Sequence, residues 1–242
     1  MERKTACILG VNVDRDGMDK AYEKATAFLA GESAKTIYTP NPEIINAALK
    51  NDEYRQVLNR ADMVVPDGIG VVYASKIIGQ PVAERVAGYD LTCRILEYAA
   101  ENGTKVFIYG GKPGVADAAA QKLTEKGVNM VGTMHGYQQD ENAVIQAINE
   151  ADAEFVLVCL GAPKQEIWID KNKDKTKARL FIGAGGSVDV IAGNTKRAPE
   201  IFIKLNLEWF YRLLKQPSRI GRMMQLPVFM LKVIVSGRRY LK

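Results

Sequence analysis

Residues 61–70 read Ala-Asp-Met-Val-Val-Pro-Asp-Gly-Ile-Gly, and this stretch predicts a strand that turns directly into a helix. The apolar run 63–65 is typical of a strand buried on both faces. Pro66 cannot donate to a sheet ladder and should end the strand. Two glycines then let the backbone turn, and apolar residues recur at helical spacing over 71–78. Asp67 is therefore expected at the carboxyl end of a strand, where open α/β sheets bind ligands, unless it merely caps the helix.

The composition is that of an ordinary globular protein. The chain has 242 residues, of which 47% are hydrophobic and 25% charged, enough for one large α/β domain or a domain plus an appendage. Three scattered cysteines and a single histidine form no metal-ligand pattern, so we expect no zinc site and a reduced, intracellular protein. The start lacks the apolar core of a signal peptide, and no apolar run reaches the about 18 residues that span a bilayer.

The charge is concentrated at the end of the chain. Residues 195–242 hold 11 Lys/Arg against two acidic residues, a net charge of +9, whereas residues 1–194 carry 22 basic and 26 acidic residues, a net charge of −4. A nucleic-acid binder with a basic face over the whole domain is therefore not expected. The asymmetry favours a basic tail with an anionic target.

Strands and helices alternate along the first 194 residues. We expect strands near 6–13, 36–39, 63–65, 105–109, 128–133, 155–160 and 180–182, with helices between most of them. This alternation predicts an α/β fold with a doubly wound, mostly parallel, Rossmann-like sheet. At least five strand ends carry polar or glycine residues (39–41, 67, 110–111, 161–166 and 183–189), and parallel strands would place them on one edge. That convergence predicts a ligand site.

Several of these strand ends have both a functional and a plain interpretation. Thr39 and Asn41 flank Pro40 in a stiff polar hook that suits a hydroxylated ligand, although the same segment could only cap the next helix. The guanidinium of Arg85 can form paired hydrogen bonds to a phosphate or a carboxylate. The plain alternative is that Arg85 is an ordinary surface arginine. The segment 14–16 (Asp-Arg-Asp) matches the D-x-D pattern of metal-dependent sugar-nucleotide enzymes, but an ordinary turn is the favoured interpretation.

Two glycine-rich turns resemble phosphate-binding loops. Gly110-Gly111 follows one expected strand and Gly185-Gly186 follows another, each just before a helix. Backbone N–H groups at such turns can reach a phosphate. The full G-x-G-x-x-G spacing is missing, so neither turn alone is specific.

The basic tail is expected to form an amphipathic helical appendage, residues 195–242, on a catalytic domain, residues 1–194. The pattern predicts a helix over 199–216, with favourable i,i+4 pairs Glu200–Lys204 and Glu208–Arg212 and a wide apolar face. The apolar run 226–235 with basic flanks suits an interfacial helix on anionic lipid. A dimer interface or core packing is the alternative.

Taken together, the motifs resemble the WecG/TagA/CpsF family of bacterial glycosyltransferases, glycosyltransferase family 26. The resemblance covers nearly the whole chain, and its length and tail are most similar to the TagA-like branch. It rests on these segments: 39–43 (Thr-Pro-Asn-Pro-Glu), 66–68 (Pro-Asp-Gly), the Arg85 loop, 109–111 (Tyr-Gly-Gly), 136–137 (Gly-Tyr), 161–166 (Gly-Ala-Pro-Lys-Gln-Glu), the glycine run 183–189, 197–199 (Arg-Ala-Pro) and 207–213 (Leu-Glu-Trp-Phe-Tyr-Arg-Leu).

The resemblance implies an activity, which we state as an expectation. Enzymes of the TagA-like branch move N-acetylmannosamine from UDP to the 4-hydroxyl of undecaprenyl-diphosphate-linked N-acetylglucosamine, with inversion and no required metal, in wall teichoic acid synthesis. The expected partners are thus a UDP-sugar donor, a lipid-linked diphosphate acceptor and an anionic membrane surface, with no cofactor. The expected location is cytoplasmic, attached peripherally to the inner face of the membrane. A homo-oligomer is also compatible with the sequence, because the apolar surface of the tail could form a dimer interface.

The expected site residues have four roles. Inverting transfer needs one base, for which Asp67 is the first choice and Glu166 or Asp189 the alternatives. Fixed N–H dipoles and arginines would stabilise the departing diphosphate without a metal. Substrate binding is expected at Thr39, Asn41, Arg85, Gln165, Glu166, Arg212, Arg219 and Arg222, and nucleotide binding at Gly110, Gly111, Tyr137, Gly185, Gly186 and Asp189.

Other functions remain open at this stage. A mannosaminuronic acid donor, as in the WecG-like branch, differs by one carboxylate, and no residue excludes it. A Rossmann-like nucleotide-binding oxidoreductase is less favoured, because the first strand is not followed by G-x-G-x-x-G and an acidic residue about 20 positions on. A non-catalytic membrane scaffold would leave the polar strand ends unexplained.

Overall fold

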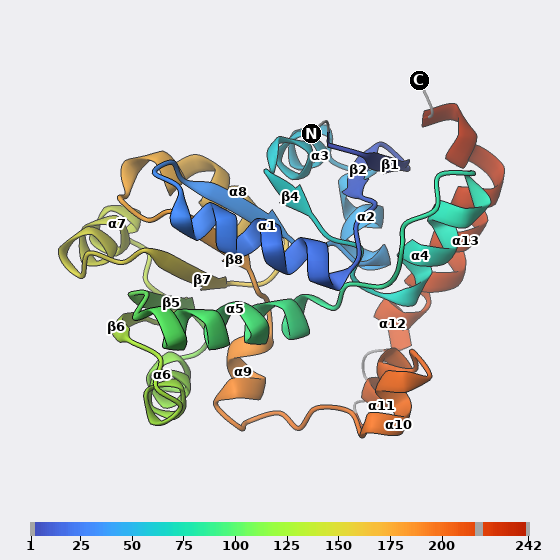
Figure 1. Ribbon diagram of the computed structural model, residues 1–242. Helices are drawn as coiled ribbons and strands as arrows, with labels where there is room; N and C mark the ends of the chain where they lie inside the picture. Colours follow the sequence, from blue (N-terminus) through green and yellow to red (C-terminus); the bar gives the residue numbers. More distant parts are fainter. Residues whose placement is uncertain (1–2, 216–219, 241–242) are drawn as a thin grey trace.

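A computed structural model of the chain describes residues 3–215 and 220–240 and shows an α/β fold built on a six-stranded parallel sheet (Figure 1). The strand order is β4-β3-β8-β7-β5-β6, and the strands are β3 (Lys35–Tyr38), β4 (Met63–Val64), β5 (Val106–Gly110), β6 (Met130–Met134), β7 (Phe155–Cys159) and β8 (Leu180–Gly183). The expected doubly wound parallel sheet is confirmed. All six carboxyl ends lie on one edge of the sheet because every pairing is parallel.

Helices cover both faces of the sheet. One face packs against α1 (Met18–Ala30), α5 (Gly88–Asn102), α6 (Val115–Glu125) and α9 (Ser187–Ile191). The other packs against α2 (Pro42–Ala48), α3 (Asp52–Arg60), α4 (Ile69–Ile77), α7 (Glu141–Glu150) and α8 (Lys164–Asn172), the last followed by a short 3-10 turn, η1 (Lys173–Lys175). Alternate residues of β7 enter the two cores, Leu157 on the first face and Val156 on the second. The strands are apolar throughout because both faces are buried.

The first expected strand is wrong, because residues 6–13 form a hairpin instead of one strand. β1 (Thr5–Ile8) pairs antiparallel with β2 (Val11–Asp14) in a separate two-stranded sheet. The chain reverses at Leu9 and Gly10, which have φ angles of 52° and 87°. Such left-handed pairs make the two-residue turns whose twist suits a hairpin. Leu9 occupies a left-handed position that usually holds Gly, Asn or Asp, so the sequence did not predict this turn.

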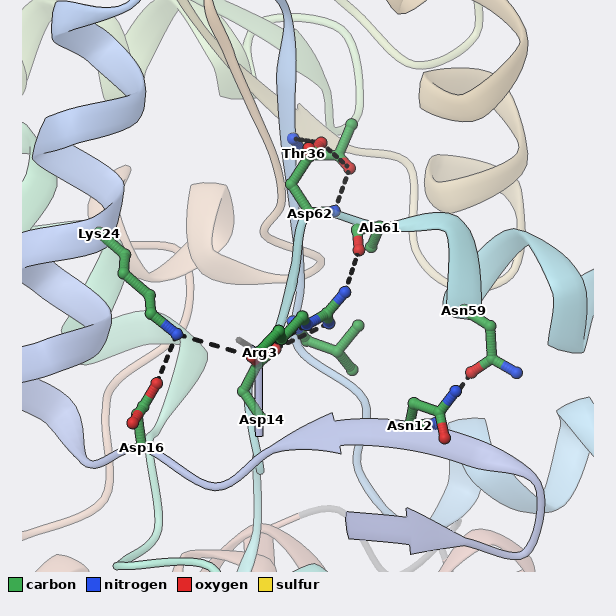
Figure 2. Close-up of polar contacts among 10 residues, drawn as sticks. Arg3, Asn12, Asp14, Asp16, Lys24, Thr36, Asn59, Ala61 and Asp62 are labelled. Carbon is green, nitrogen blue, oxygen red and sulfur yellow. Dashed lines mark hydrogen bonds and ion pairs between the residues drawn. The ribbon is translucent and has the colours of Figure 1, made fainter. Parts of the chain in front are cut away.

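The hairpin covers the edge of the large sheet through a buried carboxylate (Figure 2). Asp14 accepts the backbone N–H of Val64 in β4 at 2.7 Å and two hydrogen bonds from Arg3 at 3.0 and 2.8 Å. Lys24 lies between Asp14 and Asp16, at 3.8 and 2.5 Å. Both aspartates of the D-x-D pattern are therefore paired with cations, which supports the turn interpretation over a metal site.

The appendage consists of short helices, and the single helix expected over 199–216 is wrong. α10 (Glu200–Lys204) and α11 (Glu208–Lys215) are separated at Asn206, whose φ angle of 57° ends the first helix. α12 (Ile220–Met223), α13 (Gln225–Ser236) and the 3-10 turn η3 (Gly237–Tyr240) follow. α13 lies along α2 and α4 and buries Phe229 and Val233 in the core of that face (Figure 1). The appendage is thus packed on the domain along one side.

Candidate active site

A pocket lies at the carboxyl ends of β3 and β4, between the α/β domain and the appendage. Its volume is about 210 Å³. The domain supplies the wall formed by Asn41, Pro42 and Glu43, by 67–70 and by Arg85, and the appendage supplies Asn206, Glu208, Trp209, Gln225 and Leu226. Asp67 therefore lies in a cavity that both parts of the chain build. A second cavity, between α5, α6 and α9, lies on a helical face away from the strand ends.

Backbone hydrogen bonds fix the domain side of this pocket. Val65 N–H donates to Tyr38 O at 2.9 Å, and Asp67 N–H donates to Pro40 O at 3.3 Å. Val86 N–H donates to Pro66 O at 3.0 Å, which joins the Arg85 loop to the same segment. Three loops far apart in sequence are thereby held side by side, with Asp67 in the middle loop.

Residues that follow β3 and β4 stabilise the local structure, and some of them also line the pocket. Asn41 is the N-cap of α2, since its side-chain oxygen accepts the N–H of Ile44 at 3.0 Å, yet Asn41 also lines the pocket. Thr39 donates its hydroxyl to Gly183 O at 3.3 Å. Asp67 is half-buried and precedes Gly68, the N-cap residue of α4. The cap position thus belongs to the glycine and not to Asp67.

Arg85 joins the domain to the appendage through charges. Its guanidinium contacts the Glu208 carboxylate at 2.5 Å and donates to Asn206 Oδ1 at 3.2 Å. Arg197 lies 4.0 Å from the other oxygen of Glu208 and 2.5 Å from Asp90. The expected pair Glu208–Arg212 lies outside the described residues because of the Arg212 side chain, whereas Glu208 pairs with Arg85 across the domain boundary. The pair Glu200–Lys204 is confirmed at 2.8 Å.

The two glycine turns lie at the same edge, after β5 and β8. Gly110 packs so closely on Cys159 that an added Cβ would lie 2.4 Å from its carbonyl carbon. Gly111 N–H donates to Cys159 O at 3.1 Å, and Gly185 N–H donates to the Gln165 side chain at 3.0 Å. These two N–H groups are therefore already bonded within the protein. A phosphate would need other donors of the two turns, among them Gly186, whose surface is exposed.

The remaining expected nucleotide-binding residues lie nearby. Tyr137 is exposed and follows Gly136, whose N–H donates to Gly111 O at 2.8 Å. Asp189 is half-buried in α9. Nucleotide binding at these positions stays a prediction.

Gln165 and Glu166 lie beneath the edge instead of facing the pocket. Both side chains are buried, at 2% and 1% exposure. Burial raises the pKa of Glu166 above its ordinary value, although hydrogen bonds from Gln165 and Tyr54 oppose the shift. Neither side chain is placed to touch a sugar in this conformation. Arg219 lies outside the described residues, as do the side chains of Arg212 and Arg222.

Within residues 3–215 and 220–240, no three His, Cys, Asp or Glu side chains come together as ligands for a metal ion. In the same ranges, none of the helices has the length and apolar character needed to cross a bilayer.

The sequence placed appendage arginines at the expected site but did not reveal which appendage residues line this pocket. Glu208, Trp209 and Gln225 line it together with Asp67, but their partners are distant in sequence. One signal existed, because Glu208 is one of only two acidic residues in the basic tail. An acid retained there indicates a specific cationic partner, which the structure identifies as Arg85.

Comparisons with known proteins agree with this architecture. The sequence model described as "Glycosyl transferase WecG/TagA/CpsF family" matches residues 6–242. A Staphylococcus aureus (strain MRSA252) protein named N-acetylglucosaminyldiphosphoundecaprenol N-acetyl-beta-D-mannosaminyltransferase is 38% identical over 239 residues, which is 97% of this chain and 94% of the relative. A protein of the same name from Bacillus spizizenii (strain ATCC 23059 / NRRL B-14472 / W23) is 39% identical over 215 residues, 88% of this chain and 84% of the relative.

Proposed function

Because the chain belongs to the WecG/TagA/CpsF family of glycosyl transferases, we propose that it catalyses the reaction for which these relatives are named. It transfers N-acetylmannosamine from a UDP donor to undecaprenyl-diphosphate-linked N-acetylglucosamine, in synthesis of the wall teichoic acid linkage unit. The observation that carries this proposal is identity of 38% along 97% of the chain, which includes the loops and the appendage around the pocket.

Asp67 acts as the general base. The acceptor hydroxyl attacks the anomeric carbon of the donor, its proton passes to the Asp67 carboxylate, and the bond from that carbon to the UDP oxygen breaks. The relatives' name specifies a β product, and a UDP-sugar carries an α linkage, so a single displacement with inversion accounts for the outcome. Asp67 lies in the pocket at a strand end, whereas the alternative Glu166 is buried among hydrogen-bond donors.

The leaving diphosphate is stabilised by cations and N–H dipoles of the protein, without a metal. Arg85 lines the pocket within the same loop cluster as Asp67. Its charge is shared with Glu208, so an entering diphosphate would compete with that carboxylate for the guanidinium. Arg212, Arg219 and Arg222 would add further positive charge from the appendage, because all three follow Glu208 within the same basic segment.

The appendage attaches the enzyme to the inner face of the cell membrane, where the lipid-linked acceptor resides. On α13, Leu231, Ile234 and Val235 are 62–66% exposed, opposite the buried Phe229 and Val233. Arg238 and Arg239 follow directly and are exposed. An exposed apolar strip beside cations is the pattern of a helix that lies in the interface of an anionic membrane.

The decisive experiment measures UDP release from UDP-N-acetylmannosamine with a short-chain lipid-diphosphate N-acetylglucosamine acceptor, with EDTA present. We expect acceptor-dependent release that survives EDTA and falls at least about a hundredfold in Asp67→Asn, as loss of a general base should. Asp174→Asn, a change at an exposed aspartate on η1 that has no role at the site, serves as the control and should retain activity.

Other outcomes would redirect the proposal. Full turnover by Asp67→Asn would exclude Asp67 as the base. Turnover only with the uronic acid donor would change the substrate within the family. No turnover with either donor, together with quenching of nicotinamide fluorescence on titration, would favour the oxidoreductase alternative.

A further inference from the structure

Glu166 lies buried on α8 and makes its bonds to neutral groups. Its carboxylate oxygens accept from Tyr54 Oη at 3.0 Å and from Gln165 Nε2 at 2.7 Å. Its main-chain oxygen accepts from Tyr38 Oη at 3.1 Å. None of the ion pairs formed among residues 3–215 and 220–240 includes Glu166. A carboxyl placed in a core without a cation is costly to retain, so it calls for a specific explanation.

The bond from Gln165 to Glu166 follows from the surroundings of the Gln165 amide. Its Oε1 accepts two backbone N–H groups, from Gly161 at 3.1 Å and Gly185 at 3.0 Å. Backbone N–H groups can only donate, so the oxygen of the amide must face them. The amide nitrogen must then face Glu166, whose oxygen accepts from it.

The two glycines that Gln165 holds belong to different loops at the candidate site. Gly161 follows β7, and Gly185 follows β8. At the end of β8 the Gln165 amide also packs directly under Gly183, where an added Cβ would lie 3.0 Å from Nε2. Gly183 O in turn accepts from Thr39 at the end of β3. Partly buried hydrogen bonds and close packing thus connect the carboxyl ends of three neighbouring strands, β7, β8 and β3.

We propose that Glu166 is a positioning residue for the transfer reaction, which fixes the Gln165 amide so that the loops after β7 and β8 keep their places beside the substrates. This inference rests on the proposed function, because it concerns the same edge of the sheet. Glu166 does not touch substrate and acts through Gln165. Tyr54 completes the network by fixing the far oxygen of the carboxyl.

The network requires a side chain at position 166 that can form hydrogen bonds to both Gln165 and Tyr54; a side chain that only fills the space is not enough. Alanine at position 166 would leave the Gln165 amide without its acceptor, so the amide could rotate away from Gly161 and Gly185. Glutamine at the same position keeps the shape, accepts from Gln165 with its oxygen and donates to Tyr54 with its nitrogen. Glu166→Gln should therefore preserve the arrangement that Glu166→Ala destroys.

The test compares Glu166→Ala, Glu166→Gln and Asn172→Ala in the full-length enzyme. Asn172 is the matched control, because it is buried on the same helix but bonds to Lys175 rather than to the glycine loops. We measure kcat and KM for donor and acceptor well below each variant's melting temperature, together with amide hydrogen exchange at Gly161 and Gly185. Tyr54→Phe, which removes one bond and keeps the ring, gives the same comparison if Glu166→Ala does not fold.

We expect Glu166→Ala to lower kcat at least about tenfold, a loss equivalent to roughly 1.4 kcal/mol of transition-state stabilisation. The two glycine amides should exchange faster in that variant, while Glu166→Gln and Asn172→Ala stay within about threefold of wild type. Tyr54→Phe should change both readouts in the same direction as Glu166→Ala but less. Equal losses in Glu166→Ala and Asn172→Ala, or unchanged glycine exchange, would overturn the inference. An inactive wild type would instead refute the proposed function, and the exchange measurement would still decide the network.

Discussion

Asp14 is a buried carboxylate that holds the N-terminal hairpin on the edge strand β4. It is 2% exposed and accepts from Arg3 and from Val64 N–H, so its removal leaves a cation and a strand-edge N–H without their partner. We expect Asp14→Ala to lower the free energy of unfolding by about 3 kcal/mol, in the range for breaking a buried pair. Asp16→Asn, which removes a partly exposed partner of Lys24, should cost only about 0.5 kcal/mol. Urea unfolding of both variants measures the difference, and equal costs would show that Asp14 does not hold the edge.

Glu166 gives a pH-dependent stability whose sign follows from its burial. Burial raises the pKa of Glu166 above the value of 4.5 expected for an unfolded chain. The folded protein therefore keeps a proton that the unfolded chain has released, and its stability falls as the pH rises above about 4.5 toward the folded-state pKa. Glutamine does not titrate, so the advantage in melting temperature of Glu166→Gln over wild type should increase from pH 5 to pH 8. An advantage that shrinks with pH would mean that Glu166 is held ionised.

At the scale of elements, Gly70 determines how closely α13 packs on α4. An added Cβ would lie 2.7 Å from Leu226 Cδ1 and 2.8 Å from Pro42 Cγ, so both neighbours would have to move. Alanine gains about 1 kcal/mol of helix propensity over glycine, but overpacking costs about 1–3 kcal/mol. We expect the packing cost to prevail in Gly70→Ala, with faster hydrogen exchange in α13 and unchanged exchange in the sheet. Gly221→Ala, where an added Cβ meets open space, is the control and should leave α13 exchange as it is.

The elements themselves were predictable wherever local pattern decides them. Apolar strands such as β7 and the amphipathic helix α1 lie where their periodicity places them, because burial on a face repeats with the backbone geometry. Two left-handed residues, Leu9 and Asn206, were not predictable, and each one broke an expected element in two. The partners of Glu166 and Glu208 were equally hidden. Tyr54 lies 112 positions and Arg85 lies 123 positions away, and such pairs depend on the fold as a whole.

At the scale of the whole molecule, the two parts of the chain meet at the candidate site through charge and packing together. Glu208 contacts Arg85 on one side and lies near Arg197 on the other, and Asn46 donates to the main-chain oxygen of Gln225 at 3.1 Å. Lys232 turns inward and donates to the same Asn46 at 3.2 Å. The pocket around Asp67 therefore exists only when the appendage is docked. The appendage forms one wall of the pocket. A membrane or a protein that binds the outer side of the appendage would therefore affect the shape of the pocket.

This arrangement leads to a prediction about membrane attachment. Leu231 and Ile234 are exposed on α13 and are not needed for its packing, which Phe229 and Val233 provide. Burying each exposed side chain in the lipid interface is worth about 1.5–3 kcal/mol, so Leu231→Glu with Ile234→Glu should weaken binding to phosphatidylglycerol vesicles at least about a hundredfold. Ile167→Glu alters an exposed isoleucine on α8, outside the appendage, and should bind as wild type does. Binding is measured by vesicle sedimentation, and light scattering follows the oligomeric state. The wild-type protein could instead fail to bind the vesicles and form a dimer that the double substitution dissociates. That result would show that a second copy of the chain, and not lipid, covers this face.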